Sequence, residues 1–219
     1  MQKYYKIILF LLVSSVVQAQ KSTVDFRTRS SATLNLNLHK GWKFSTQYQV
    51  RFDENSSVYR GSYLYADVDK KILKYLSAGI GYRFALVGEE KFNRFSANIE
   101  GKYKFKNFTF SLRELYQTQR QIVAGDDEGT AESYLRSRLD IRYAASKKLD
   151  FAISAEPFVH KKDGIIKTDF WRNRVGVTYE YLKNKRVNLF YIWQPDVNKT
   201  YPDTKNILGI NFIFDLKVK

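Results

Sequence analysis

Apolar and polar residues alternate at every second position through most of this chain, and this period restricts its fold more than any other feature. In residues 42–52 the even positions are Trp, Phe, Thr, Tyr, Val and Phe, whereas the odd positions are all polar. The same contrast recurs in residues 76–84, 94–105, 135–143, 149–156, 174–181 and 208–217. A period of two is typical of a β-strand with two unlike faces. The sequence therefore predicts an all-β protein.

The predicted strands are about nine to fourteen residues long, which exceeds the usual strand of a soluble domain and suffices for a tilted strand to cross a bilayer. Short turns near residues 39–41, 72–74, 106–107, 144–147 and 183–185 alternate with longer polar links at 53–58, 85–91, 121–132, 160–167 and 195–206. Outer-membrane barrels have short periplasmic turns and long external loops. We therefore expect the short turns, and both chain ends, on the periplasmic side.

The first residues have the pattern of a secretory signal. Lys3 and Lys6 precede an apolar run over residues 7–17, and Val17-Gln18-Ala19 is a small-residue pattern that signal peptidase can cleave. The run is about half the length of a membrane-spanning helix. We expect residues 1–19 to be a cleaved signal peptide and residues 20–219 to form one barrel in the outer membrane of a Gram-negative bacterium.

The strand count is the open point of the fold. An open edge would leave backbone groups unpaired in hydrocarbon, so a membrane barrel must close. Eleven strands are clear, the first over about residues 32–39, whereas single-chain bacterial barrels usually have an even number. We predict an antiparallel up-and-down transmembrane β-barrel of about 12 strands (range 10–12), the twelfth a short strand at residues 23–29 with Val24 and Phe26 outward. A single long first strand, or an N-terminal segment inside the lumen, also fits the pattern.

Aromatic residues favour a membrane barrel over a soluble one. In lipid the apolar face needs no complementary packing, and aromatic side chains gather near strand ends as interfacial girdles. Eight aromatic residues lie at such positions: Trp42, Phe52, Tyr75, Phe84, Phe105, Phe108, Tyr143 and Tyr181. A soluble periplasmic β-barrel binding protein is kept as an alternative.

The composition excludes several classes of function. The chain has no cysteine, which removes disulfides and thiolate metal sites, and its two histidines lack metal-ligand spacing. No nucleic-acid-binding motif accompanies the 37 Lys and Arg residues, which outnumber 22 Asp and Glu residues. We expect no metal and no cofactor. Outer-membrane lipids and small anionic solutes are the expected partners, with lysine and arginine near the external rim as candidates to hold lipid phosphates.

The polar faces of the strands carry more arginine than acid, and these residues are the candidate lumen lining. The set comprises Arg51, Arg83, Arg94, Glu100, Arg113, Arg136, Arg138, Asp140, Arg142, Glu156, Arg172, Arg174 and Glu180. If the arginines outnumber their partners, the lumen is electropositive and selects anions. If most pair with carboxylates, they fill the barrel as a structural plug. The expected function is therefore a non-enzymatic barrel that is either a narrow channel or a plugged scaffold.

An outer-membrane lipid-modifying hydrolase is the enzymatic alternative. Such an enzyme needs a nucleophile or an activated water beside a base. His160 follows Ser154 and Glu156 toward the external rim and is the better candidate base, whereas His39 lies at a predicted periplasmic turn. No catalytic motif surrounds either histidine, and we expect no catalytic residue.

Short motifs spread along the chain resemble those of an outer-membrane barrel family catalogued as domain of unknown function 2490. They are Asp25-Phe26, Lys40-Gly41-Trp42 leading to Arg51, Gly79-Ile80-Gly81-Tyr82, Glu156-Pro157-Phe158 and Arg172-Asn173-Arg174. The likeness covers nearly all of the chain after the signal. It implies a barrel and no particular activity.

Overall fold

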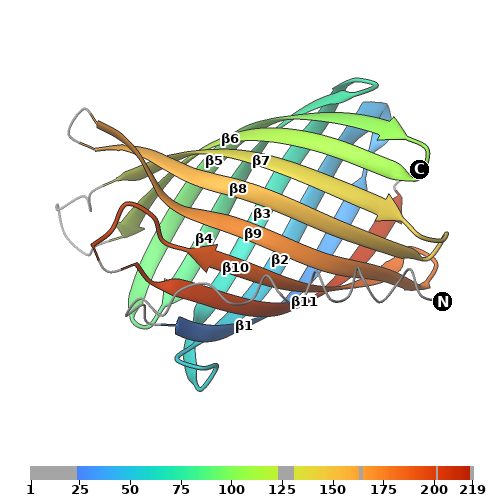
Figure 1. Cartoon of the computed structure of the whole chain (residues 1–219). Coiled ribbons are helices and arrows are strands. Elements are labelled where there is room, and N and C mark those ends of the chain that lie inside the picture. Colours follow the sequence, from blue (N-terminus) through green and yellow to red (C-terminus); the bar gives the residue numbers. More distant parts are fainter. Residues whose placement is uncertain (1–23, 123–130, 163–164, 201, 218–219) are drawn as a thin grey trace, which may run out of the picture.

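The structure is a computed structural model that describes residues 24–122, 131–162, 165–200 and 202–217, so the predicted signal peptide lies outside the described residues. Within that part the chain forms eleven strands and one short 3-10 turn (Figure 1). The strands are β1 (Val24–Asn37), β2 (Trp42–Asp53), β3 (Val58–Leu73), β4 (Leu76–Val87), β5 (Glu90–Phe105), β6 (Phe108–Ile122), β7 (Glu132–Ala144), β8 (Leu149–Lys162), β9 (Ile165–Leu182), β10 (Lys185–Pro195) and β11 (Thr204–Lys217), and the 3-10 turn is η1 (His39–Gly41).

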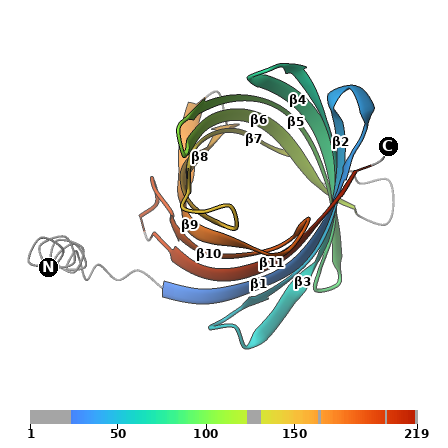
Figure 2. The ribbon, with the colours of Figure 1, turned by 90° about the vertical axis from the view of Figure 1, so that its right-hand side faces the viewer.

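The strands close into a single barrel, which Figure 2 shows from near one end. Each strand pairs antiparallel with the next strand in the chain, and β1 closes the ring by pairing parallel with β11. The predicted all-β barrel is confirmed. The strands are 11 to 18 residues long, and several extend into segments predicted as links: β8 and β9 are separated only by residues 163–164.

The count of eleven lies within the predicted range of 10–12, but the prediction of a twelfth strand at residues 23–29 is wrong. Residues 24–37 form one continuous strand, which confirms the alternative of a single long first strand. No glycine or proline interrupts this segment, and its alternation continues unbroken from Phe26 and Thr28 on the outer face to Leu34 and Leu36. The even-number expectation failed because it assumes antiparallel pairing at every junction. A parallel junction closes a barrel with an odd number of strands.

The parallel junction also places the two end strands differently from the expectation. Val24 pairs with Thr204 at the end of the barrel where the longer connections lie, whereas Asn37 pairs with Lys217 at the opposite end. We call these the loop end (connections 54–57, 88–89, 123–131, 163–164 and 196–203) and the short-turn end (connections 38–41, 74–75, 106–107, 145–148 and 183–184). The barrel therefore begins at the loop end and finishes at the short-turn end, so its first strand does not start where both chain ends were expected.

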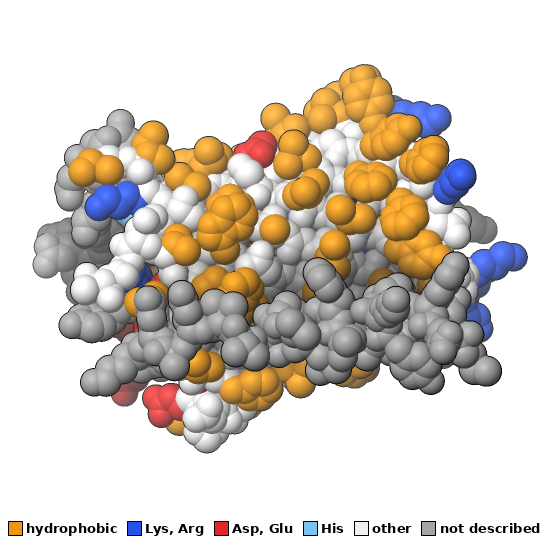
Figure 3. Space-filling model, in the orientation of Figure 1, with side chains coloured by type: hydrophobic (Ala, Val, Ile, Leu, Met, Phe, Trp, Pro, Cys, Tyr) orange, Lys and Arg blue, Asp and Glu red, His pale blue; other side chains and the backbone are white. Residues whose placement is uncertain are grey.

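Burial is inverted relative to a soluble protein. Large apolar side chains are exposed on the outer face, for example Ile80 at 67% and Ile99 at 57%, and Figure 3 shows many hydrophobic side chains on the described part of one side of the barrel. Buried side chains are mostly polar and lie on the inner face, including Gln49, Gln117 and Asn188. An exposed apolar band of this extent marks a surface that contacts an apolar medium or partner.

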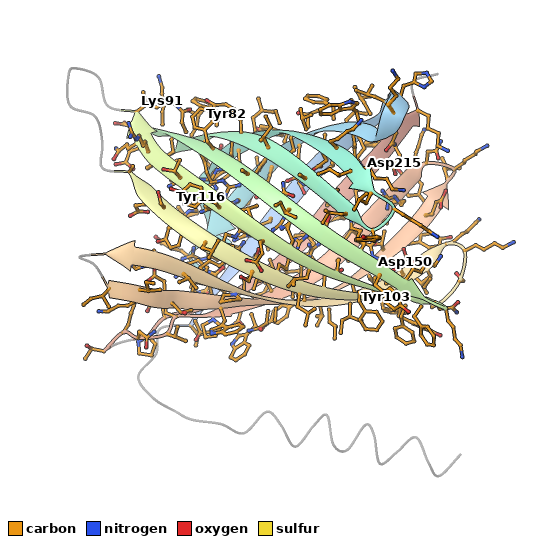
Figure 4. All side chains as sticks on the ribbon, turned by 90° about the horizontal axis from the view of Figure 1, so that it is seen from above. Tyr82, Lys91, Tyr103, Tyr116, Asp150 and Asp215 are labelled. Atoms are coloured by element: carbon orange, nitrogen blue, oxygen red, sulfur yellow. The ribbon has the colours of Figure 1, made fainter. Side chains whose placement is uncertain are left out.

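Exposed aromatic side chains lie near both ends of the outer face. Toward the short-turn end they include Trp42, Tyr75, Tyr103, Phe105 and Phe108, and toward the loop end Tyr59, Tyr82, Tyr116 and Tyr191. Figure 4 shows Tyr103 near one end and Tyr82 and Tyr116 near the other. No helix among the described residues is long and apolar enough to span a membrane.

Candidate functional site in the barrel lumen

The thirteen candidate lumen residues all lie on the polar face of their strands. They come from β2 (Arg51), β4 (Arg83), β5 (Arg94, Glu100), β6 (Arg113), β7 (Arg136, Arg138, Asp140, Arg142), β8 (Glu156) and β9 (Arg172, Arg174, Glu180). The structure does not gather them into one cluster. Glu100, Arg142 and Glu180 lie near the short-turn end, while most of the others form two groups in the middle of the barrel.

The first group is centred on the carboxylate of Glu156, which is 2% exposed. Nη2 of Arg136 donates to Oε2 of Glu156 at 2.8 Å, and Nη2 of Arg113 donates to Oε1 at 3.0 Å. Nη1 of Arg172 lies 3.8 Å from Oε2. One carboxylate thus faces three guanidinium groups from β6, β7 and β9, and the cluster keeps an excess of positive charge.

Aromatic side chains contact two of these arginines, Arg136 and Arg172, on the side that faces the loop end. The guanidinium carbon of Arg136 lies 4.2 Å from the ring centre of Phe158, and that of Arg172 lies 4.4 Å from it. Phe158 stacks in turn on Phe170, with 4.2 Å between ring centres. Cation–π contacts of this kind orient a guanidinium without neutralising it.

The second group lies on β2 to β5, where the partners of the arginines are neutral. The guanidinium carbon of Arg51 lies 3.7 Å from the ring centre of Tyr63, and its Nη2 donates to the hydroxyl of Tyr65 at 2.7 Å. Arg83 donates to the amide oxygen of Gln119. The guanidinium carbon of Arg94 lies 5.6 Å from the ring of Tyr65. None of these contacts brings a carboxylate to a guanidinium group, so the positive charges are left uncompensated.

Further arginines share this property. Arg174 donates to Oδ1 of Asn188 at 2.5 Å and lies over the ring of Phe190. Within the described part of the chain, no carboxylate lies within 4.0 Å of the guanidinium nitrogens of six inner arginines: Arg29, Arg51, Arg83, Arg94, Arg138 and Arg174. The partners of the central arginines are therefore mostly neutral hydrogen-bond acceptors and aromatic rings.

Two adjoining cavities remain inside the barrel beside these groups. One, of about 180 Å³, is lined by Arg29, Ser31, Gln47, Gln49, Arg136, Arg138, Ser154, Glu156, Arg172, Arg174, Phe190, Ile192 and Asn211. The other, of about 190 Å³, is lined by Asp140, Arg142, Ala152, Ile153, Ser154, Arg174, Gly176, Thr178, Arg186, Asn188, Asn211 and Ile213. Ser154, Arg174 and Asn211 belong to both linings. The first cavity carries five arginines against one carboxylate.

Acidic side chains are present on one part of the inner face. Asp67 and Asp69 of β3 lie across from Gly81 and Gly79 of β4, where a Cβ atom would collide with the carboxylates. These two glycines give the aspartates room on the β3–β4 wall toward the short-turn end. The inner face is therefore strongly basic in its middle and mixed in charge toward the short-turn end.

His160, the candidate base of the enzymatic alternative, lies on the inner side near the loop end. Its Nδ1 is 2.9 Å from Oδ2 of Asp169, to which the hydroxyl of Tyr134 also donates at 3.1 Å. Among the described contacts no serine, threonine or carboxamide joins the imidazole, so these residues do not form a nucleophile and base pair. His39 lies in η1 at the short-turn end. The described residues contain no group of His, Asp and Glu side chains arranged to hold a metal ion.

Sequence reasoning missed several residues of the site. Arg29 and Arg186 contribute to the inner face but were not among the candidates, and Tyr63 and Tyr65 supply the neutral partners of the second group. β3 carries large side chains on both faces, which hides its alternation. Tyr63 and Tyr65 have the same parity as Asp67 and Asp69, and this shared parity could have shown that the two tyrosines lie on the polar face of β3.

The family model described as "Protein of unknown function (DUF2490)" matches residues 26–205. A solved structure with the description "NanC porin structure in rhombohedral crystal form" has a TM-score of 0.51 at 12% sequence identity, with 77% of this chain and 86% of that chain covered. No curated protein sequence matches the chain. At this identity the likeness to the porin shows a shared fold.

Proposed function

This chain belongs to the family of proteins of unknown function DUF2490, and we propose that it is a non-enzymatic β-barrel of the outer membrane whose lumen is a narrow channel that favours small anions. The observation that carries the proposal is the excess of guanidinium charge in the middle of the barrel over the carboxylates there. Different features of the structure support the membrane location, the open lumen and the anion selectivity.

The outer face supports the membrane location. Its exposed apolar band would be unfavourable in water, whereas in a bilayer it replaces lipid–lipid contacts at little cost. Aromatic residues at both ends of the band match the two interfaces. By the usual architecture of such barrels, the short-turn end faces the periplasm and the loop end faces outward. The shared porin fold agrees with this placement.

The partners of the arginines favour a channel over a neutral plug. A plug built from ion pairs would match each guanidinium with a carboxylate. In this barrel Glu156 serves three arginines, and Arg51 and Arg83 bond to tyrosine and glutamine oxygens. The charge that remains can be balanced by mobile anions in the adjoining cavities. Rings of basic side chains act in this way in anion pores.

Hydrogen bonding and stacking also explain why the channel is narrow. Arg136 and Arg172 are folded against Phe158, and Arg51 is folded against Tyr63, so the side chains occupy the middle of the lumen in a fixed arrangement. The two cavities beside them have the size of a few water molecules or one small ion each. We therefore propose small hydrated anions as solutes.

Electrical recording in planar bilayers tests the proposal. We expect discrete conductance steps and, under a KCl gradient, a reversal potential with the sign of chloride selectivity. Heat-modifiable gel mobility in detergent establishes that the inserted protein is folded. Folded protein without conductance would show that the barrel is a plugged scaffold, and a reversal potential of the cation sign would refute anion selectivity.

A further inference from the structure

The two ends of the barrel carry opposite charge in their connections. The five connections at the short-turn end contain six lysines and no acidic residue: Lys40, Lys74, Lys106, Lys147, Lys148 and Lys183. The five connections at the loop end contain, in sequence, eight acidic residues and one lysine. Every turn at the short-turn end has at least one lysine. Positive charge is thus distributed around the whole circumference of one rim.

The lysines of this rim are exposed and lie beside the aromatic girdle. All six of them are exposed, and Lys185 and Lys217 extend the rim at the adjacent strand ends. Lys or Arg side chains project from the short-turn end at the right of Figure 3. Nζ of Lys106, a rim lysine, lies 5.4 Å from the ring of Phe105, and Nζ of Lys70, on β3 next to the rim, lies 4.8 Å from the ring of Trp42. Ammonium groups therefore lie level with, or just beyond, the rings that mark the edge of the apolar band.

We propose that this lysine rim binds the phosphate groups of anionic phospholipids and so collects such lipids around the short-turn end of the barrel. The proposal rests on the membrane location given above, and not on the conductance. An aromatic ring at the interface with lysines just outside it places cations at the depth of lipid phosphates. Basic residues next to a bilayer surface attract anionic headgroups.

The distribution of the lysines favours lipid over a protein partner. A docked protein covers one side of a barrel and would be matched by a patch on one or two turns. Here the lysines repeat on all five turns, around the whole circumference of the barrel, as the surrounding lipids do. The loop-end connections contain one lysine in sequence, Lys199, which pairs with Asp196 at 2.6 Å, so these connections offer less positive charge to lipid phosphates than the lysine rim does.

The three tryptophans of the chain provide reporters for the two rims. Trp42 is 45% exposed at the short-turn end, whereas Trp193 is 48% exposed on the outer face of β10 near the loop end. A variant with Trp171→Phe and Trp193→Phe leaves Trp42 as the sole tryptophan. A variant with Trp42→Phe and Trp171→Phe leaves Trp193. Both are refolded into vesicles of equal parts phosphatidylcholine and phosphatidylglycerol, with one of the two lipids brominated in its acyl chains.

Bromine quenches tryptophan only on close contact, so the quenching ratio reports which lipid surrounds each residue. For Trp42 we expect quenching by brominated phosphatidylglycerol to exceed that by brominated phosphatidylcholine at least about twofold, and to fall toward equality in 1 M NaCl because salt screens the attraction. For Trp193 we expect no such preference. Both leaflets have the same composition, so the result does not depend on which way the barrel inserts.

Charge variants identify the lysines as the cause. In the Trp42 reporter, Lys40→Asn with Lys74→Gln should remove most of the preference, and asparagine suits the left-handed backbone at Lys40, where φ is 55°. Lys91→Gln with Lys167→Gln removes two exposed lysines from the loop end and should leave the preference unchanged. All variants should show heat-modifiable mobility, which establishes that they are folded.

Equal quenching of Trp42 by the two brominated lipids would overturn the proposal, as would a preference that survives loss of Lys40 and Lys74. A preference at Trp193 equal to that at Trp42 would also overturn it, because the selectivity would then not belong to this rim. A folded barrel that conducts nothing but enriches phosphatidylglycerol at Trp42 would refute the channel and leave this inference standing.

Discussion

Arg136 and Glu156 lie on the neighbouring strands β7 and β8, 6% and 2% exposed, with 2.8 Å between Nη2 and Oε2. Both side chains are therefore packed among neighbouring side chains of the inner face and are not exposed to a wide, water-filled space. The pair is not an isolated ion pair, since Arg113 reaches the other carboxylate oxygen at 3.0 Å. Glu156 is therefore the residue whose loss should reveal most about both stability and charge.

Glu156→Gln should destabilise the barrel and make it more selective for anions. Removing the carboxylate leaves Arg113, Arg136 and Arg172 without an opposite charge, and breaking such a buried pair costs about 3–5 kcal/mol. Urea unfolding in lipid vesicles measures the stability. Asp215→Asn is the matched control, because it breaks one less buried pair with Arg186 and should cost about 1 kcal/mol or less. Equal losses in the two variants would contradict the central role of Glu156.

Arg51→Gln with Arg94→Gln should reduce the permeability of chloride relative to potassium. Each charge removed, acting over roughly 10 Å of water, changes the free energy of an anion by about 0.4 kcal/mol, or a factor of about two. The same change favours potassium by as much as it disfavours chloride, so each substitution should lower the ratio roughly fourfold and the two together roughly sixteenfold. Reversal potentials under a KCl gradient give this number. Lys91→Gln, on the exposed loop end, is the control and should change the ratio little; an effect as large as that of the double variant would locate the selectivity at the mouth.

Ile99→Arg should destabilise the barrel in lipid by about 2–4 kcal/mol, because this side chain points outward from the middle of β5. Tyr103→Arg, on the same face of the same strand but near the short-turn end, should cost about 0–1 kcal/mol. The comparison is made by unfolding both variants in phosphatidylcholine vesicles. If the two variants lose the same stability, the outer face does not cross the hydrocarbon layer.

A cysteine pair tests the parallel closure. Ala32 and Phe212 are direct partners across the β1–β11 junction and both are exposed on the outer face, so Ala32→Cys with Phe212→Cys should form a disulfide on mild oxidation. Ala32→Cys with Leu208→Cys displaces one partner by four residues, roughly 13 Å along the strand, and should not. The chain has no cysteine of its own to interfere. Gel mobility without reductant reads the outcome, and a disulfide only in the second variant would require a different register.

The alternation of apolar and polar residues predicted the strands and the face on which each side chain lies. Alternation in residues 42–52 indicated which side chains of β2 share a face, and Arg51 follows from it. The direction and register of the closing junction do not follow, because the pairing of Val24 with Thr204 joins residues far apart in the chain and leaves no mark on either segment. The sequence could therefore predict that the barrel closes, but not that its last junction is parallel.

The sequence could not predict the net charge of the lumen, for a related reason. Whether an arginine keeps its charge uncompensated depends on the partner that reaches it from another strand. The hydroxyl of Tyr65 and the amide of Gln119 take that place for Arg51 and Arg83, and neither contact has a signature in the sequence. The lysines of the five short turns are the opposite case, since their turn positions alone would have predicted a basic rim.

The junction between β1 and β11 is the one pair of neighbouring strands, among those described, that no hairpin connects. Ten of the junctions can form as soon as two successive strands meet, with a turn to set their register. The last must wait until both edge strands exist, and it must then be recognised by side chains and backbone alone. Assembly of this barrel is therefore expected to have a distinct final step, in which the two edge strands of a curved sheet, β1 and β11, pair with each other. The same seam is the place where the finished cylinder would first reopen.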